Sequence, residues 1–220
     1  MSEEFSESER HGLVLITGNE EAILSVGIST AGKAEIEMIR RAPNAHIIAT
    51  TLDENGVGHT QALLHRKGLT DKIEVRYEDV SEPLPYEDSS IDFIYARLVL
   101  HYLSKQKLES TLRELSRVMK PASKLYVVVR SVECDDMKLR GISFDEVTGL
   151  TTYQGSKPSG EKYSAQRFFH SKDSINEYMQ THFKILSIKQ YDEALFRDYE
   201  RTIPSPNKDN LIEVIAEKEV

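Results

Sequence analysis

The segment Gly27 to Lys33 (GISTAGK) follows the short apolar run Ala22 to Val26 and precedes a helical pattern. A loop of small residues between a strand and a helix lets the backbone pass close to a bound ligand. Two carboxylates, Asp53 and Asp79, come just after later apolar runs that are typical of strands. Open α/β sheets bind ligands beyond the carboxyl ends of their strands, so this loop is the first place to look for a binding site.

The loop matches the GxxxxGK pattern of a P-loop, in the strand–loop–helix context that a phosphate cradle needs. The next residue is Ala34, however, where the magnesium chemistry of a P-loop needs a Ser or Thr hydroxyl. The later strand, Leu125 to Val129, ends in Arg130 rather than in an Asp suited to the metal. A P-loop-like nucleotide binder is therefore a minor alternative.

The loop also lies one glycine short of the dinucleotide fingerprint GxGxxG, because Ser29 replaces its second glycine. Asp53 falls near the position where an acid would bind the ribose in that arrangement. Nothing downstream supplies hydride chemistry, so this second alternative is also a minor one.

Alternating strands and helices must position the loop. Each predicted strand up to Leu125 to Val129 is followed by a helical or loop segment, which favours a parallel sheet with right-handed crossovers. The last strand alternates in a way that suits an antiparallel partner. The predicted strands cover residues 22–26, 46–51 and 72–77, a segment that begins at 91 and ends before Arg97, and then residues 125–129, 183–190 and 210–217. The predicted helices cover 34–41, 60–66, 108–119 and 171–181.

Residues 90–103 (SIDFIYARLVLHYL) and 117–121 (RVMKP) resemble the middle of class I S-adenosylmethionine-dependent methyltransferases. Those enzymes typically read GSFDxVxxxxxLHHL and then RVLKPGGxLxxxE, and residues 83–92 resemble their LPFxDxSFD stretch. The resemblance covers residues 22–129 well and the remainder loosely. It implies an α/β fold: a three-layer Rossmann-like sandwich with a mostly parallel seven-stranded sheet and an antiparallel C-terminal hairpin strand.

The resemblance also implies S-adenosylmethionine as cofactor. The family loop is usually written [DE]xGxGxG, and here Ser25 replaces its acid while small residues replace two of its glycines. Thr51 replaces the acid that usually grips the ribose, although Asp53 could reach instead, and Asp79 matches the residue that bonds the adenine amine. The expected cofactor-binding residues are Ser25, Gly27, Ile28, Ser29, Gly32, Thr51, Leu52, Asp53, Asp79, Val80, Ala96 and Arg97.

Methyl transfer from a sulfonium is an in-line displacement that depends chiefly on alignment and exclusion of water, so a general base is needed only if the acceptor must lose a proton. The candidates are His170 and His101, with Tyr163 aiding orientation. Each prominent residue also has a structural interpretation: a turn cap for Asp79, a core histidine for His101 and a salt bridge for Arg97. No metal site is expected.

The length of 220 residues suits one methyltransferase-like domain, 1–220, with residues 1–20 as an N-terminal tip or lid and 133–170 as an inserted substrate cover. A net charge of −8 argues against nucleic acid as a partner and favours a small-molecule acceptor. One cysteine, no apolar run long enough to cross a membrane and no signal peptide indicate a cytoplasmic protein.

The sequence thus predicts an enzyme that transfers a methyl group to a small-molecule acceptor. The alternative is a non-catalytic methyltransferase-like scaffold or regulatory protein, with weakened or absent cofactor binding and a protein as its partner. It is motivated by the missing loop acid at Ser25 and the missing ribose acid at Thr51, since each lost charge-assisted hydrogen bond costs about 1.5–3 kcal/mol.

Overall fold

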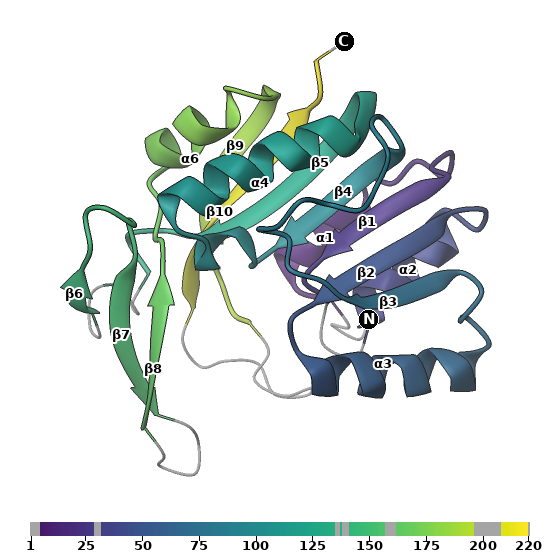
Figure 1. Cartoon of the computed structure of the whole chain (residues 1–220), viewed down its shortest axis with the longest axis horizontal. Coiled ribbons are helices and arrows are strands. Elements are labelled where there is room, and N and C mark those ends of the chain that lie inside the picture. Colours follow the sequence, from purple (N-terminus) through teal and green to yellow (C-terminus); the bar gives the residue numbers. More distant parts are fainter. Residues whose placement is uncertain are drawn as a thin grey trace.

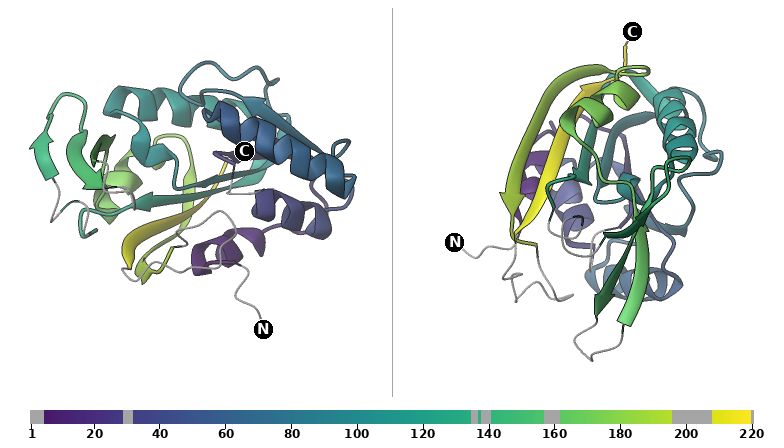
Figure 2. Two further views of the ribbon diagram at one scale, coloured as in Figure 1. Left: turned by 90° about the horizontal axis from the view of Figure 1, so that it is seen from below. Right: turned by 90° about the vertical axis from the view of Figure 1, so that its left-hand side faces the viewer.

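The computed structural model describes residues 5–28, 32–134, 137, 141–156, 162–195 and 208–219. A seven-stranded sheet lies between two layers of helices, and a smaller three-stranded sheet projects to one side (Figures 1 and 2). The strands of the large sheet are β1 (Ala22–Val26), β2 (His46–Thr51), β3 (Ile73–Tyr77), β4 (Ile91–Arg97), β5 (Met119–Arg130), β9 (Lys184–Glu193) and β10 (Asp209–Glu217). The small sheet contains β6 (Gly141–Phe144), β7 (Thr151–Ser156) and β8 (Lys162–Arg167). The helices are α1 (Glu7–Leu13), α2 (Lys33–Arg41), α3 (Glu54–Lys67), the 3₁₀ turn η2 (Leu100–Tyr102), α4 (Lys105–Val118) and α6 (Lys172–Met179).

The large sheet has the strand order β3-β2-β1-β4-β5-β10-β9. Strands β1 to β5 pair in parallel, whereas β10 is antiparallel to both β5 and β9. The chain moves outward in one direction from β1 to β3 and then returns to place β4 on the other side of β1. The carboxyl ends of β1 and β4 therefore flank the point where the strand order reverses. The predicted fold class is confirmed.

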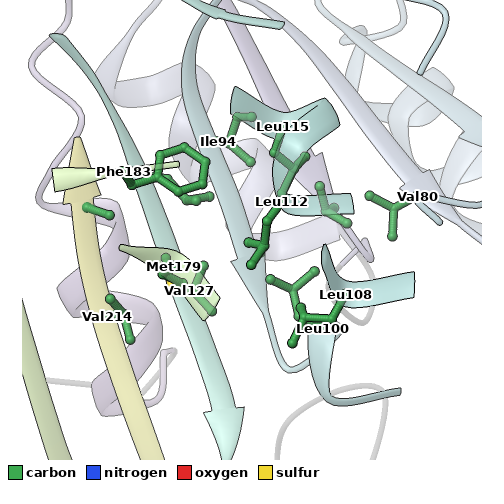
Figure 3. Packing of buried hydrophobic residues seen from close by; sticks show 14 of the residues in the cluster. Val80, Ile94, Leu100, Leu108, Leu112, Leu115, Val127, Met179, Phe183 and Val214 are labelled. Atoms are coloured by element: carbon green, nitrogen blue, oxygen red, sulfur yellow. The ribbon is translucent and has the colours of Figure 1, made fainter. Parts of the chain in front are cut away.

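Two apolar cores flank the sheet. One contains the inward side chains of α4 and α6, and Figure 3 shows Leu112 and Leu115 of α4 beside Ile94 of β4. The other lies under α1, α2 and α3 and includes Met38 and Phe93. Successive strand residues alternate between the two cores because strand side chains point to opposite faces. Each fully buried leucine of this kind contributes about 1.5–3 kcal/mol through removal from water.

Some element boundaries differ from the predicted ones for identifiable reasons. Helix α3 begins at Glu54 rather than at residue 60, because the Asp53 carboxylate caps it by accepting a hydrogen bond from the Asn55 backbone N–H. The segment 133–170 lacked a clear period in sequence, yet it contains the antiparallel strands β6, β7 and β8. Within the described part of the chain, no helix is long and apolar enough to cross a membrane.

The turn between α4 and the regular part of β5 holds Ala122 in a left-handed conformation, with φ of +61°. Its backbone N–H donates a 3.0 Å hydrogen bond to the carbonyl of Lys218, just after β10. A residue with a Cβ carries a cost of about 1–2 kcal/mol in this region of φ/ψ space. The turn thus ties the end of the chain to the start of β5 at the expense of local strain.

Candidate functional site

A cavity of about 220 Å³ opens beyond the carboxyl ends of β1, β2 and β3, beside η2. It lies at the reversal of strand order, the position at which open α/β sheets bind their ligands. Most of its exposed lining is apolar, with carboxylates at one side. The lining residues are Val26, Gly27, Thr50, Thr51, Leu52, Glu78, Asp79, Val80, Val99, Tyr102 and Leu103.

Gly27 turns the chain directly after β1, with φ of +76°. A Cβ at this position would lie 2.0 Å from Cγ2 of Val99, which follows β4. Only glycine combines this backbone conformation with so close a neighbour. The backbone N–H of the next residue, Ile28, donates a 2.7 Å hydrogen bond to the Thr50 carbonyl and fixes the start of the loop against β2.

Two adjacent carboxylates reach the cavity from the end of β3. Asp79 Oδ1 accepts a 2.9 Å hydrogen bond from the Ser81 backbone N–H, which orients its carboxylate. The Tyr86 hydroxyl lies 2.8 and 2.9 Å from the two carboxylate oxygens of Glu78. Burial, together with the Glu78 charge, raises the pKa of Tyr86, so this tyrosine stays protonated and can donate to Glu78. Asp79 is therefore a turn cap as well as part of the cavity wall.

The end of β2 presents hydroxyl and apolar groups instead of an acid. Asp53 donates its backbone N–H to Thr51 Oγ1 at 3.1 Å, and its carboxylate caps α3. Asp53 is thus the N-cap of α3, and it is not among the residues that line the cavity. The side chain of Leu52 does line it and is 57% exposed, which leaves an apolar surface for a flat ring to cover.

Beneath the loop, the Ser25 hydroxyl donates a 2.7 Å hydrogen bond to Oε1 of Glu35, and both residues are fully buried. Glu35 lies in the first turn of α2, which begins after Gly32. The sequence interpretation missed Glu35. The available signal was an acid in the first helical turn after a loop that had lost its own acid. Ser29 lies outside the described residues.

The side chain of Arg97 extends from the end of β4 to the N-terminal segment and not to the cavity. Its Nε donates to the Ser8 hydroxyl at 2.7 Å, and one Nη donates to the Ser6 hydroxyl at 2.9 Å. Ion pairs to Glu9 and Glu193 span 3.8 and 3.6 Å. The preceding residue, Ala96, is fully buried in the sheet. This arrangement makes Arg97 an anchor for α1.

His101 and His170 are fully buried at the junction of the large sheet and the small one. Neither ring nitrogen of His101 has a hydrogen-bond partner among the residues that the structure describes. Burial, and then the positive charges of Arg167 and Arg130, hold the pKa of His101 well below its usual value. Burial lowers the pKa of His170 to about 3, so both rings are neutral near pH 7.

Strand β8 joins the small sheet to this region. The Phe168 backbone N–H, just after β8, donates a 2.7 Å hydrogen bond to the His101 carbonyl. Arg167 lies over the rings of Tyr102 and Tyr153, at 5.3 and 5.0 Å from their centroids. Tyr163 is 39% exposed on β8, and its ring covers the cross-strand neighbour Gly155.

The structure thus brings only some of the predicted cofactor-binding and catalytic residues together around the cavity. Those that line the cavity are Gly27, Thr51, Leu52, Asp79 and Val80. Of the others that the structure describes, the ones outside this lining are Ser25, Ile28, Gly32, Asp53, Ala96, Arg97, His101, Tyr163 and His170. The lining residues that the sequence did not single out include Glu78, Val99 and Tyr102.

Residues 23–122 match a protein family described as a methyltransferase domain. This match spans β1 to the turn before the regular part of β5, which includes the loop and the cavity. Residues 23–122 are thus similar to a methyltransferase domain. The resemblance of residues 22–129 to this superfamily is thereby confirmed.

A methyltransferase from Methanosarcina mazei shares the fold, with a TM-score of 0.72 at 19% identity over 91% of this chain and 93% of that one. The Burkholderia thailandensis 1,6-didemethyltoxoflavin-N1-methyltransferase, solved with bound 1,6-didemethyltoxoflavin and S-adenosylhomocysteine, has a TM-score of 0.62 at 12% identity, over 100% of this chain and 80% of that one. An uncharacterized Haemophilus influenzae protein is 34% identical over 76 residues, which are 34% of this chain and 30% of that protein.

The residues of the cavity fit S-adenosylmethionine as the cofactor of such a methyltransferase domain. Leu52 and Val80 offer apolar faces to an adenine ring, and the Asp79 carboxylate can accept a hydrogen bond from an exocyclic amine. Gly27 allows close approach of a ligand to the backbone. The comparisons and the donor set together support a methyltransferase enzyme.

Proposed function

We propose that this protein binds S-adenosylmethionine in the cavity beyond β1 to β3 and transfers its methyl group to a small-molecule acceptor. The observation that carries the proposal is the position of that cavity at the reversal of strand order, with Gly27 and Asp79 on its walls. Residues 133–170 are proposed to cover the acceptor within one domain. With its single cysteine the chain has no internal disulfide, which favours a cytoplasmic location.

In this proposal Asp79 binds the adenine amine, while Leu52 and Val80 cover the ring faces. Thr51 and Glu78 are proposed to lie closest to the ribose hydroxyls. Thr51 ends β2 and Glu78 directly follows the neighbouring strand β3, where its backbone N–H donates to the Thr51 carbonyl. Thr51 stands where the family usually has a ribose-binding acid. Glu78, which is hydrogen-bonded by Tyr86, binds the ribose in its place. The bound cofactor supplies an activated methyl group, so the protein has only to align the acceptor and exclude water.

The acceptor is proposed to lie between η2 and the small sheet. Tyr102 lines the cavity on one side and contacts Arg167 of β8 on the other, so it connects the cofactor region to the cover. His101 and His170 flank this junction, and a bound acceptor could satisfy either ring nitrogen of His101 or Nε2 of His170. Their lowered pKa values keep both imidazoles neutral near pH 7, so each can orient an acceptor by hydrogen bonding rather than hold its proton. Tyr163 lies on the edge strand β8 of the small sheet.

The first test is calorimetric titration of the purified chain with S-adenosylmethionine and with S-adenosylhomocysteine. We expect micromolar binding for the wild type and at least a tenfold loss in Asp79→Asn, since one charge-assisted hydrogen bond is worth about 1.5–3 kcal/mol. Asp71→Asn is the matched control, because Asp71 is exposed in the turn at the opposite end of β3.

Binding that Asp79→Asn does not weaken would overturn the placement of the adenine. Absence of binding up to millimolar cofactor would favour the non-catalytic scaffold. If the cofactor binds, mixtures of phenols, amines and carboxylic acids with radiolabelled cofactor would reveal the acceptor class. Loss of transfer, with unchanged cofactor affinity, is then expected for His101→Asn.

A further inference from the structure

A buried carboxylate lies directly under the glycine loop. Glu35 and Ser25 are both 0% exposed, and their side chains are joined by the 2.7 Å hydrogen bond from Ser25 Oγ to Glu35 Oε1. The other carboxylate oxygen, Oε2, lies 3.9 Å from the point where a Cβ on Gly32 would stand. The two residues come from different elements, β1 and α2, so the bond closes the loop that connects them.

The position of this charge relates it to the cavity. Ser25 immediately precedes Val26 and Gly27, both of which line the cavity. Glu35 is in the first turn of α2, where the helix dipole favours a negative group. A carboxylate held in a site that excludes water acts on nearby charges more strongly than it would in solvent.

We infer that Glu35 is a positioning residue for the cationic end of the cofactor: through Ser25 and the loop it supplies the negative charge that the chain lacks at position 25. The inference rests on the proposed function. It also bears on the scaffold alternative, because the missing loop acid was one reason for that alternative. Asp53 does not take over this role, since its carboxylate caps α3.

The test compares two ligands on three proteins. S-adenosylhomocysteine carries an ammonium group on its amino-acid part, whereas 5′-methylthioadenosine shares the nucleoside and lacks that part. In Glu35→Gln we expect the affinity for S-adenosylhomocysteine to fall roughly tenfold or more, because a charge interaction in a dry site is lost. The affinity for 5′-methylthioadenosine is expected to change less than about twofold, since no ligand charge is involved.

The third protein is Ser25→Asp/Glu35→Gln, which returns one carboxylate to this site from the β1 side. We expect it to recover most of the affinity for S-adenosylhomocysteine. Thermal unfolding of each variant is measured alongside, so that a loss of folding is seen directly. Should Glu35→Gln fail to fold, the double variant and its ligand preference still test the charge.

Equal loss of both ligands in Glu35→Gln would show a purely structural role and overturn the inference. Unchanged affinity for both ligands would overturn it as well. Either result leaves the proposed function standing, provided that the wild type binds S-adenosylhomocysteine. A wild type that binds neither ligand overturns the proposed function and the inference together.

Discussion

The guanidinium of Arg97, at the end of β4, donates a 2.7 Å hydrogen bond to the hydroxyl of Ser8 in α1. Two acidic residues, Glu9 and Glu193, lie around this bond and are only 1% and 4% exposed. Glu193 also accepts the Ser8 backbone N–H at 2.8 Å. Since Arg97 compensates two buried carboxylates, it connects α1 with the ends of β4 and β9.

Replacing Arg97 by alanine is therefore expected to destabilise the protein by about 3–5 kcal/mol, because carboxylates would be left buried without their cation. Urea unfolding followed by circular dichroism measures this change. Arg40→Ala is the matched control: its side chain is 64% exposed, and an ion pair of that kind contributes about 0–1 kcal/mol. Equal effects of the two substitutions would refute the anchoring role of Arg97.

Gly27→Ala places a Cβ 2.0 Å from Val99 Cγ2 at a φ of +76°. We expect a loss of about 2–3 kcal/mol of stability from the combined strain and clash, with weaker binding of S-adenosylhomocysteine. Gly58→Ala is the control, since a Cβ there has nothing within 4 Å, and in helix α3 it should stabilise by about 1 kcal/mol. Normal ligand affinity in Gly27→Ala would show that the loop is not part of the binding site.

The buried His170 predicts sensitivity to acid. Its pKa of about 3 in the folded protein lies below the ordinary 6.5, so between these values the unfolded chain binds a proton that the folded one does not. The contribution of the neutral His170 ring to the free energy of unfolding is thus fully present above pH 6.5 and is lost as the pH falls toward 3. The slope is about 1.4 kcal/mol per pH unit for one such group.

The variant His170→Phe should show a shallower decline between pH 6.5 and 5 by roughly that slope, measured by urea unfolding at each pH. Phenylalanine suits the site because Phe168 and Tyr178 already contact the His170 ring. His59→Asn, at an exposed position, should parallel the wild type. Parallel curves for all three proteins would contradict the assignment.

Ala122 offers a prediction of opposite sign. With φ of +61° it carries left-handed strain that glycine avoids, and we expect Ala122→Gly to stabilise the protein by about 0.5–1 kcal/mol after the entropy cost of glycine. The same change at Ala62, exposed in α3, should cost about 1 kcal/mol. Destabilisation at both positions, in the same unfolding assay, would show that the turn is relaxed with alanine.

Sequence patterns predicted most of the fold because buried strands and amphipathic helices leave local signals. β1 and β2 begin and end at the predicted residues, and the Leu108, Leu112 and Leu115 face of α4 is buried as its spacing indicates. The three-stranded sheet was harder to predict, because its strand β8 is largely exposed and so lacks an apolar period.

The site was predicted less completely because its side-chain contacts depend on how loops fold and on how helices pack, which residue patterns do not encode. Asp79 could be identified from its place after a strand, but the choice of Tyr86 as a partner for Glu78 depends on how the following loop folds back. The Ser25–Glu35 pair joins residues whose side chains meet only when α2 packs on β1. Arg97 likewise has its partners 89 and 91 residues away, at Ser8 and Ser6.

The contact between α1 and Glu193 has a consequence for synthesis of the protein. Ser8 is synthesised 185 residues before its partner Glu193 in β9. Until β9 is made, α1 packs through Gly12 on the stacked rings of Tyr95 and Tyr126 without its contact to Glu193. Nascent chains that end before β9 therefore hold α1 over this aromatic surface with only part of its final contacts, which favours exposure of the surface to other chains.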